Sequence, residues 1–529
     1  MSQADKYGSL SKDDLIARIQ QLEETLRGAK PGNARSSRSS VAHLRREQKP
    51  FDIAAQPKRK IALKFTYDGQ FYNGLEHQTL PTPLPTVEEV LWNALVHTRL
   101  VDPDVGFEGV GWEKCGRTDR GVSGAGQVVS FWIRSALKHN TPLSPTLSAD
   151  NTSQAIVEHQ LPTAAAEDDE SGLEGDFGAL GSWDEPPSNT VKPAITAAHS
   201  MDDNDELKYV STLNAVLPPT LRVVAWSPVS SDFSARFNCR GRHYKYFFSS
   251  RGLDIEAMRD GASRLLGEHD FRNLHKLDPA KQLTTFRRRI SRAEISSVGP
   301  VNGDGTQMHV FDLLGTAFLY NQVRHIMAIL FFVGTGLERP EVVTALLNTD
   351  PQNPYPPFRP GEVDPPIVTT KPIYPMADAL PLVLWDCLYA DGDVSWRADH
   401  VNPDGSMRPS LTSARNASLQ LRAQHERTMI HATLQDHFLK AANPCHPFPP
   451  EYLPVHPDGP AIPKGVTFGL PLGGGTQIDS SVYIRLLERK RLDHVEVSNE
   501  RWRAGKGARR TERKASETGK TERVVSNPP

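Results

Sequence analysis

The sequence predicts an α+β fold of two halves, each built on a mainly antiparallel sheet. Between residues 60 and 133, alternating apolar positions are followed by a helical apolar stripe and then by a second alternating stretch. A similar order returns between residues 243 and 389. Alternation with period two indicates half-buried strands, and apolar positions spaced by three or four indicate a helix. The two halves are therefore expected at about 60–232 and 233–395.

The first half has clear boundaries for its elements. A strand is expected from Ile61 to Tyr67, and Asp68-Gly69 turns the chain after it. Thr86 and Glu89 have the spacing of a capping box, which predicts that a helix begins directly after Thr86. Alternating apolar residues predict a further strand at 129–133.

The second half is longer and ends on a strand. Its predicted elements are a strand at His243–Phe248, a helix from about Glu256 to Leu266, a strand at Val310–Leu314, a helix at Tyr320–Val333 and a strand at Leu382–Tyr389.

The two halves belong to a central domain that is expected at 51–395. Four segments flank or interrupt this domain. They are an N-terminal helix and mobile linker at 1–50, an acidic insertion at 141–206, a helical and basic extension at 396–502 and a basic tail at 503–529. The insertion has no hydrophobic periodicity and is expected to be disordered, because it cannot bury enough apolar surface to offset the loss of chain entropy. The same is expected of the tail.

The net charge of −2 hides an uneven distribution. Residues 141–206 contain fourteen Asp and Glu and one Lys, a charge of −13, which leaves +11 on the rest of the chain. A basic body suits a nucleic-acid partner. The alternative is that these cations are only solvated surface, and charge alone does not decide between the two.

The four cysteines form no C-x-x-C pair, and no apolar run is long enough for a membrane span. Free thiols in a reducing compartment, nuclear or cytoplasmic, are expected. His269 and His275 lack a third ligand nearby, and Gly473-Gly-Gly475 lacks the Lys-Ser or Lys-Thr of a phosphate loop. We therefore expect no metal, no cofactor and no membrane partner.

The most informative stretch is Cys115-Gly-Arg-Thr-Asp119-Arg-Gly-Val-Ser-Gly-Ala-Gly-Gln-Val128. Its four glycines indicate a tight loop directly before a strand. Arg117 and Arg120 flank Asp119, so the carboxylate is expected to stay ionised, as a nucleophile or base requires. The structural alternative is a hairpin turn in which Asp119 accepts hydrogen bonds from backbone N–H groups.

This loop resembles the active-site signature of the TruA family of tRNA pseudouridine synthases. Four further stretches resemble that family in the same order. They are Tyr67-Asp-Gly-x-x-Tyr72-x-Gly74-x-x-x-Gln78, Phe233-Ser-Ala-Arg-Phe237 with Arg242-x-Tyr244-x-Tyr246, Gly267-Glu-His-Asp-Phe271, and Phe318-Leu-Tyr-Asn-Gln-Val-Arg324-His-Ile. The resemblance implies a two-lobed catalytic domain with an RNA cleft between the halves.

The resemblance also implies roles for four residues. Asp119 matches the catalytic aspartate, and Tyr244 matches the tyrosine that stacks on the target base. Arg324 matches the arginine that pairs with the aspartate, and Arg117 is expected to displace the target nucleotide or to contact its phosphate. The structural alternatives are that Tyr244 is a strand residue packed in the core and that Arg324 is a surface-facing helical cation. Leu75, where relatives usually have an aromatic residue, and Gly124-Ala125 depart from the family pattern.

Several stretches resemble the eukaryotic branch that modifies uridines 38 and 39 of the anticodon arm. They include His269–Leu274, Leu380–Cys387 and the C-terminal Leu487–Leu492. This implies tRNA as the partner and a homodimer as the assembly. The alternatives are a sister synthase acting on other tRNA or small nuclear RNA uridines, and a catalytically silent RNA-binding protein. A retaining glycosidase would need a second carboxylate about 5 Å from the first, and the sequence offers no local candidate.

Overall fold

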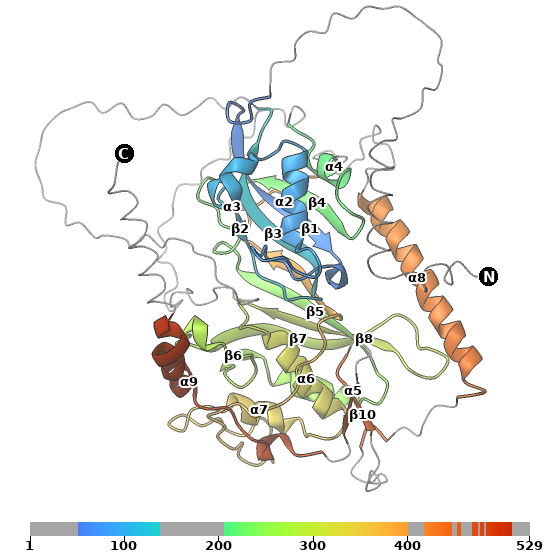
Figure 1. Ribbon diagram of the computed structural model, residues 1–529. Coiled ribbons are helices and arrows are strands. Elements are labelled where there is room, and N and C mark those ends of the chain that lie inside the picture. Colours follow the sequence, from blue (N-terminus) through green and yellow to red (C-terminus); the bar gives the residue numbers. More distant parts are fainter. Residues whose placement is uncertain are drawn as a thin grey trace, which may run out of the picture. The chain divides into compact units, whose positions relative to one another are not determined.

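A single open sheet of nine strands organises the protein (Figure 1). The structure is a computed structural model that describes residues 51–137, 206–399, 417–446, 452–455, 468–473, 477–480 and 483–509. Ile53–Pro529 forms one compact unit, and the description below concerns that unit. Along the sheet the strands follow the order β4-β1-β3-β9-β5-β8-β7-β6, and the short β2 pairs with β3. The mixed α+β class with a mainly antiparallel sheet is thereby confirmed.

The first half of the sheet carries helices on its hydrophobic face. Its strands are β1 (Lys58–Tyr67), β2 (Glu113–Lys114), β3 (Ser123–Arg134) and β4 (Leu221–Pro228). Its helices are α2 (Val87–His97), the four-residue α3 (Gly106–Gly109) and α4 (Tyr209–Asn214). The predicted capping box is present, because Thr86 accepts from the Glu89 amide and Glu89 accepts from the Thr86 amide. Side chains from β1, α2, β3 and α4 form one buried hydrophobic cluster.

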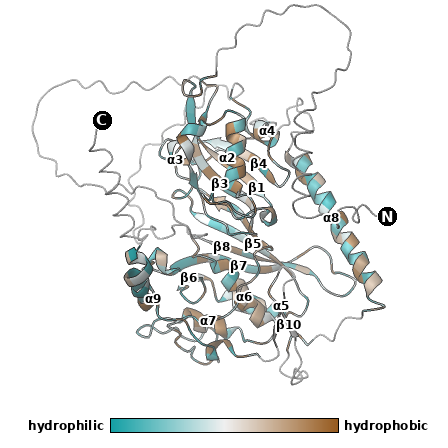
Figure 2. Cartoon of the chain, viewed as in Figure 1, coloured by the Kyte–Doolittle hydropathy of each residue, from teal (hydrophilic) through white to brown (hydrophobic). Residues whose placement is uncertain are grey.

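The second half has a larger core. Its strands are β5 (Gly241–Ser249), β6 (Gly267–Asp270), β7 (Arg287–Val298) and β8 (Met308–Gly315), and its helices are α5 (Ile255–Ser263), α6 (Gln322–Gly334) and α7 (Glu341–Leu347). The helix α6 is buried along almost its whole length. Figure 2 shows the hydrophobic colouring of the helical layer around α6 and α7. The apolar run at 326–333 is therefore the central helix of this core.

Strand β9 (Leu382–Leu388) joins the two halves. It pairs in parallel with β3 and antiparallel with β5. Leu384 is opposite Gly124 on one side and opposite Tyr244 on the other. This row places the strand that follows the Asp119 loop two strands away from the strand that carries Tyr244.

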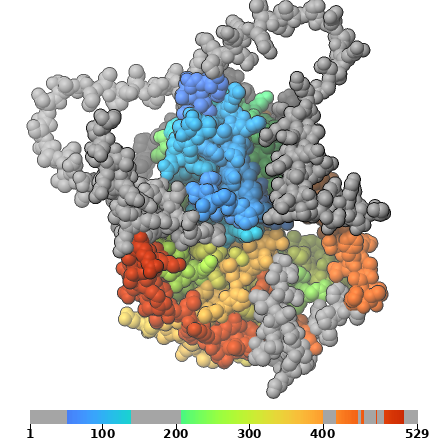
Figure 3. All heavy atoms as spheres, viewed as in Figure 1, coloured from blue at the N-terminus to red at the C-terminus, as the bar shows by residue number. Residues whose placement is uncertain are grey.

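The C-terminal extension includes the long helix α8 (Ala417–Ala442), the hairpin β10 (Phe468–Pro471) and β11 (Gln477–Ser480), and α9 (Val495–Trp502). The helix α8 lies within the extension that was expected to be helical, and among its residues only Ala417 is buried. The segment before α9 packs on the second half, because Leu486 is fully buried in its core. Arg491 forms an isolated bridge with Pro372, and Figure 3 shows this C-terminal surface against the second half.

Several elements were not predicted, among them the five that complete the two halves: β4, β6, β7, α4 and α7. In β7 a register irregularity between Ile290 and Arg292 breaks the alternation of apolar and polar residues, so the sequence pattern does not keep period two. The other four have at most eight residues each, which gives too few positions for a periodicity to be recognised.

Three expected boundaries differ from the structure. Glu206, the last residue of the expected insertion, is buried and pairs with Arg59 at 2.7 Å, so it belongs to the fold. Leu486–Glu488 is a single 3-10 turn, and no helix runs through Leu492. The chain after Trp502 stays helical through Arg503–Gly507, where a disordered tail was expected. The expected N-terminal helix, the rest of the insertion and the end of the tail lie outside the described residues.

Candidate active site

The loop between β2 and β3 is held in place by hydrogen bonds that its backbone carbonyl groups accept. The Cys115 carbonyl accepts from Arg242 Nη2 at 3.0 Å, and the Gly116 carbonyl accepts from Gln127 Nε2 at 2.7 Å. The Asp119 carbonyl accepts from the Val122 amide at 3.1 Å, which closes a turn around Asp119. A loop fixed at three carbonyls within five residues presents its side chains in a defined direction, which is the precondition for a positioned carboxylate.

Thr118, one residue before Asp119, is the anchor of the loop in the first half. Its buried hydroxyl is 2.6 Å from the Tyr67 hydroxyl at the end of β1. Its carbonyl accepts from the Leu75 amide at 3.2 Å. Gly74 has a φ of +92°, and a Cβ there would lie 3.2 Å from the Thr118 carbonyl oxygen. Leu75 itself is fully buried in the first core.

Two cations from the second half act on the Asp119 carboxylate. Arg324 Nη1, in the first turn of α6, lies 3.9 Å from Asp119 Oδ2, and Arg324 Nε donates to the Ala377 carbonyl at 2.8 Å. Lys276 is the second cation, and its ammonium lies 5.4 Å from the centre of the Tyr320 ring. The Asp119 side chain is 24 % exposed. The loop of the first half thus meets charges of the second half at this carboxylate.

Burial raises the pKa of Asp119 above its ordinary value, while Arg324 and Lys276 lower it. The expectation that Arg117 and Arg120 would keep the carboxylate ionised is therefore wrong in its residues. Arg120 is exposed, and Arg117 forms an ion pair with Glu76. The two arginines next to Asp119 in the sequence are therefore not the cations that lower its pKa. Those cations, Lys276 and Arg324, come more than 150 positions later in the chain.

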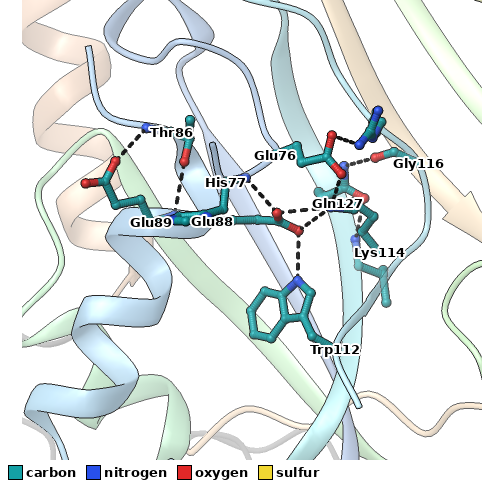
Figure 4. Close-up of polar contacts among 11 residues, drawn as sticks. Glu76, His77, Thr86, Glu88, Glu89, Trp112, Lys114, Gly116 and Gln127 are labelled. Atoms are coloured by element: carbon teal, nitrogen blue, oxygen red, sulfur yellow. Dashed lines mark hydrogen bonds and ion pairs between the residues drawn. The ribbon is translucent and has the colours of Figure 1, made fainter. Parts of the chain in front are cut away.

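Arg117 takes part in a chain of alternating charges, of which Figure 4 labels Glu76, Lys114 and Glu88. Glu76 contacts both Arg117 and Lys114, the latter at 2.9 Å, and Lys114 also reaches Glu88 at 3.0 Å. Glu88 is buried in α2 and accepts from the Trp112 indole N–H at 2.8 Å and from the His77 amide at 2.9 Å. This network holds the Arg117 guanidinium at Glu76, and its buried member, Glu88, fixes it to the core.

Tyr244 lies on β5 and is half-buried. Its ring meets Phe318 edge-on with centroids 5.1 Å apart, and burial raises its pKa. Phe318 begins the stretch that ends at Arg324. The second tyrosine of the same motif, Tyr246, is fully buried, and its hydroxyl donates to the carbonyls of Asp378 at 3.0 Å and Leu472 at 3.2 Å. Tyr246 is thus a core residue, whereas Tyr244 is half-buried against Phe318.

Comparison with known proteins identifies the family. A family model described as tRNA pseudouridine synthase matches residues 262–390. The human tRNA pseudouridine(38/39) synthase is 34% identical over 397 residues, which cover 73% of this chain and 68% of the human protein. The chain belongs to the tRNA pseudouridine synthase family. The Saccharomyces cerevisiae tRNA pseudouridine(38/39) synthase is 33% identical over 401 residues, covering 73% and 72% of the two chains. A tRNA pseudouridine synthase A from Methanothrix thermoacetophila is 26% identical over 356 residues, covering 67% and 92%.

The synthase carries site residues that the sequence did not single out. Lys276 and Tyr320 border Asp119, and Arg242 fixes the start of its loop through the Cys115 carbonyl. Tyr320 and Arg242 lie inside stretches that resemble the family, so the sequence offered a way to find them. Lys276 lies outside those stretches, and no spacing of residues marked it as part of the site. Among the described residues of the synthase, no group of three or more His, Cys, Asp or Glu could hold a metal ion. In the same ranges no helix is long and apolar enough to cross a membrane.

Proposed function

We propose that this tRNA pseudouridine synthase converts uridine to pseudouridine at positions 38 and 39 of the tRNA anticodon arm. The printed names of the human and yeast relatives give these positions for those proteins. The observation that carries the proposal is the Asp119 carboxylate, held on a fixed loop and bordered by Arg324 and Lys276. Such a group suits a reaction that needs one carboxylate at the junction of sugar and base.

The reaction breaks the N1–C1′ bond of uridine and forms a C5–C1′ bond. The proton at C5 is released and N1 takes up a proton, so the product is an isomer of uridine and nothing is oxidised. Asp119 acts at the sugar–base junction, where it can attack the sugar, add to the base or abstract a ribose proton. Arg324 and Lys276 lower the pKa of Asp119 and so favour its ionised form at neutral pH.

Two other residues are proposed to contact the RNA. Tyr244 offers a ring for stacking on the uracil, and the edge-on contact with Phe318 fixes the plane of that ring. Arg117 is proposed to contact the displaced nucleotide or its phosphate. In the RNA-free protein its guanidinium is held by Glu76, so a phosphate would have to compete with that carboxylate for it.

The rival functions are less well supported by the surroundings of Asp119. A retaining glycosidase needs a second carboxylate near the first, whereas the groups that act on Asp119 are two cations. A silent RNA-binding scaffold has no need for a carboxylate whose burial raises its pKa, because burying a charge costs free energy. Both arguments favour a working isomerase.

The experiment that tests the proposal uses the purified chain and tRNA transcripts labelled with tritium at C5 of uridine. Tritium should be released, and replacement of uridines 38 and 39 by cytidine should abolish the release. Release that persists from the doubly replaced tRNA would assign the protein to other uridines. No release from any tRNA, with binding retained, would favour the silent scaffold.

The assembly and the compartment are proposed on the resemblance alone. We propose a homodimer and a nuclear or cytoplasmic location. Light scattering of the purified chain, alone and with tRNA, measures the mass directly. A mass of one chain without tRNA, and of one chain plus one tRNA in the mixture, would contradict the dimer.

A further inference from the structure

Lys371 is a buried lysine without a carboxylate partner among the described residues. It is 9% exposed and lies in the loop between α7 and β9. Its ammonium donates to the His275 carbonyl and lies 3.1 Å from His325 Nε2. The Tyr374 ring is its third neighbour, at 4.8 Å from the ring centre. A lysine in such a place costs free energy unless it is discharged, so packing alone does not account for it.

The two histidines that Lys371 contacts are the chain neighbours of the two cations at Asp119. His275 directly precedes Lys276, and His325 directly follows Arg324. Both histidines are buried. Burial and the charge of Lys371 lower the pKa of each, so both rings are neutral at pH 7 and present no competing charge.

Hydrogen bonds to backbone groups link the segments that carry these residues. The Lys276 amide donates to the Tyr320 carbonyl at 3.0 Å, and the Ala377 amide donates to the Arg324 carbonyl at 3.3 Å. The Tyr374 hydroxyl donates to the Asn273 carbonyl at 2.7 Å. The loop before Lys276, the start of α6 and the segment 371–377 are therefore linked to one another, and Lys371 lies where the three meet.

We propose that Lys371 is a positioning residue for the reaction: by binding the His275 carbonyl and the His325 ring, it sets where Lys276 and Arg324 lie beside Asp119. Lys371 does not touch the reacting atoms. Its effect on the rate passes through the two cations. The inference rests on the proposed function, because it takes Asp119 as the catalytic carboxylate.

The same residue connects the C-terminal extension to the site. The Leu492 amide donates to the Lys371 carbonyl at 2.8 Å, and the Ile373 amide donates to the Lys490 carbonyl at 2.9 Å. The extension thus adds a short strand-like pairing to the backbone of Lys371. The fully buried Leu486 anchors this segment four residues earlier.

The test is Lys371→Met, which keeps an unbranched side chain of similar length and removes the buried charge. Single-turnover pseudouridine formation should fall by roughly 10- to 100-fold, because a small misplacement of catalytic groups has effects of that size. The dissociation constant for tRNA should change little, and the melting temperature should be no lower than that of wild type, because a buried charge is removed. Lys208→Met, at an exposed lysine of the first half, is the matched control and should behave as wild type.

A double-mutant cycle separates positioning from general damage. If Lys371 acts through the cations, Lys371→Met should reduce the rate less in an Arg324→Gln or a Lys276→Gln protein than in wild type. The same fold-loss in both backgrounds, or a wild-type rate for Lys371→Met, would overturn the inference. If Lys371→Met does not fold, His325→Phe keeps an aromatic ring and removes the ring nitrogens, and the same cycle is run with it.

Asp119→Asn distinguishes this inference from the proposed function. An active Asp119→Asn protein would remove the catalytic assignment and with it the basis for Lys371. An inactive Asp119→Asn protein beside a fully active Lys371→Met protein would overturn the inference alone.

Discussion

Tyr67 and Gly124 are paired on the neighbouring strands β1 and β3, and the Tyr67 ring fills the space that a side chain at position 124 would need. A Cβ at Gly124 would lie 2.5 Å from Tyr67 Cε1. Because the Tyr67 hydroxyl is bound to Thr118, the residue before Asp119, this close approach helps to fix the catalytic loop. The Gly124-Ala125 departure from the family pattern therefore accompanies close packing around the loop.

Gly124→Ala should consequently reduce both stability and activity. Overpacking of this kind costs roughly 1–3 kcal/mol, and the Tyr67 ring must move, taking Thr118 with it. Urea denaturation and single-turnover assays measure the two effects. Gly303→Ala is the control, because a Cβ there meets nothing within 4 Å. A Gly124→Ala protein as stable as the control would show that the ring can move freely.

Asp119→Asn should abolish turnover and leave tRNA binding intact. The change keeps the size of the side chain and removes its charge, whereas affinity for RNA comes largely from contacts with phosphates. Tritium release and filter binding measure the two properties. Asp304→Asn, on a loop of the second half, serves as the control. Turnover near the wild-type rate would remove Asp119 from the mechanism.

The pH dependence of the rate should depend on Arg324. Burial raises the pKa of Asp119 and Arg324 lowers it, so the ionised carboxylate is lost as the pH falls through a value above the ordinary one. Arg324→Gln removes the lowering cation, and the acidic limb of kcat/KM should move to higher pH. Arg251→Gln, at an arginine paired with Asp304, is the control. A limb that stays in place would show that Arg324 does not act on the charge of Asp119.

Lys371 should make stability depend on pH in a defined direction. Burial lowers its pKa to about 7, so between pH 7 and its unfolded value of 10.5 the unfolded chain holds a proton that the folded protein lacks. Stability from this group therefore rises with pH in that window. Lys371→Met should be more stable than wild type below pH 7, and the difference should shrink by up to about 1.4 kcal/mol per pH unit above it.

Denaturation of both proteins at pH 6.5 and pH 9 measures this difference. The comparison between variants cancels the titration of all other groups. A constant difference across the two pH values would mean that Lys371 stays protonated, contrary to its buried surroundings.

The cations of the C-terminal extension should divide into two kinds. The Arg489 guanidinium lies 5.1 Å from the Phe332 ring and 4.9 Å from the Tyr483 ring, so it is a packing residue. Lys490 and Arg491 are exposed. Changing both to Ala should weaken tRNA binding and flatten the slope of log affinity against log salt by up to about 0.7–0.9 per lost phosphate contact.

Arg489→Ala should instead lower the melting temperature and leave the salt slope unchanged. If the Lys490 and Arg491 double variant keeps the wild-type slope, the extension contributes packing only, and the RNA footprint moves to the surroundings of Asp119.

The sequence by itself determined the elements with a strong local signal. The strand ending at Tyr67, the helix after Thr86 and the buried helix at 322–334 follow from periodicity and capping, which act between residues close in the chain. The loop around Asp119 was identified for the same reason, since its glycines and its motif are contiguous. Elements such as β7, where a register irregularity breaks the alternation, escaped this kind of inference.

Only the tertiary structure decided the electrostatics of the site. Sequence neighbours suggested Arg117 and Arg120 as the cations beside Asp119, but the fold directs Arg117 to Glu76 and brings Arg324 and Lys276 instead. Likewise, nothing near Lys371 in the chain indicates that it contacts His275 and His325. Charge interactions depend on distance in space and on burial, and both are set by how β9 joins the two halves of the sheet, which no local pattern of residues encodes.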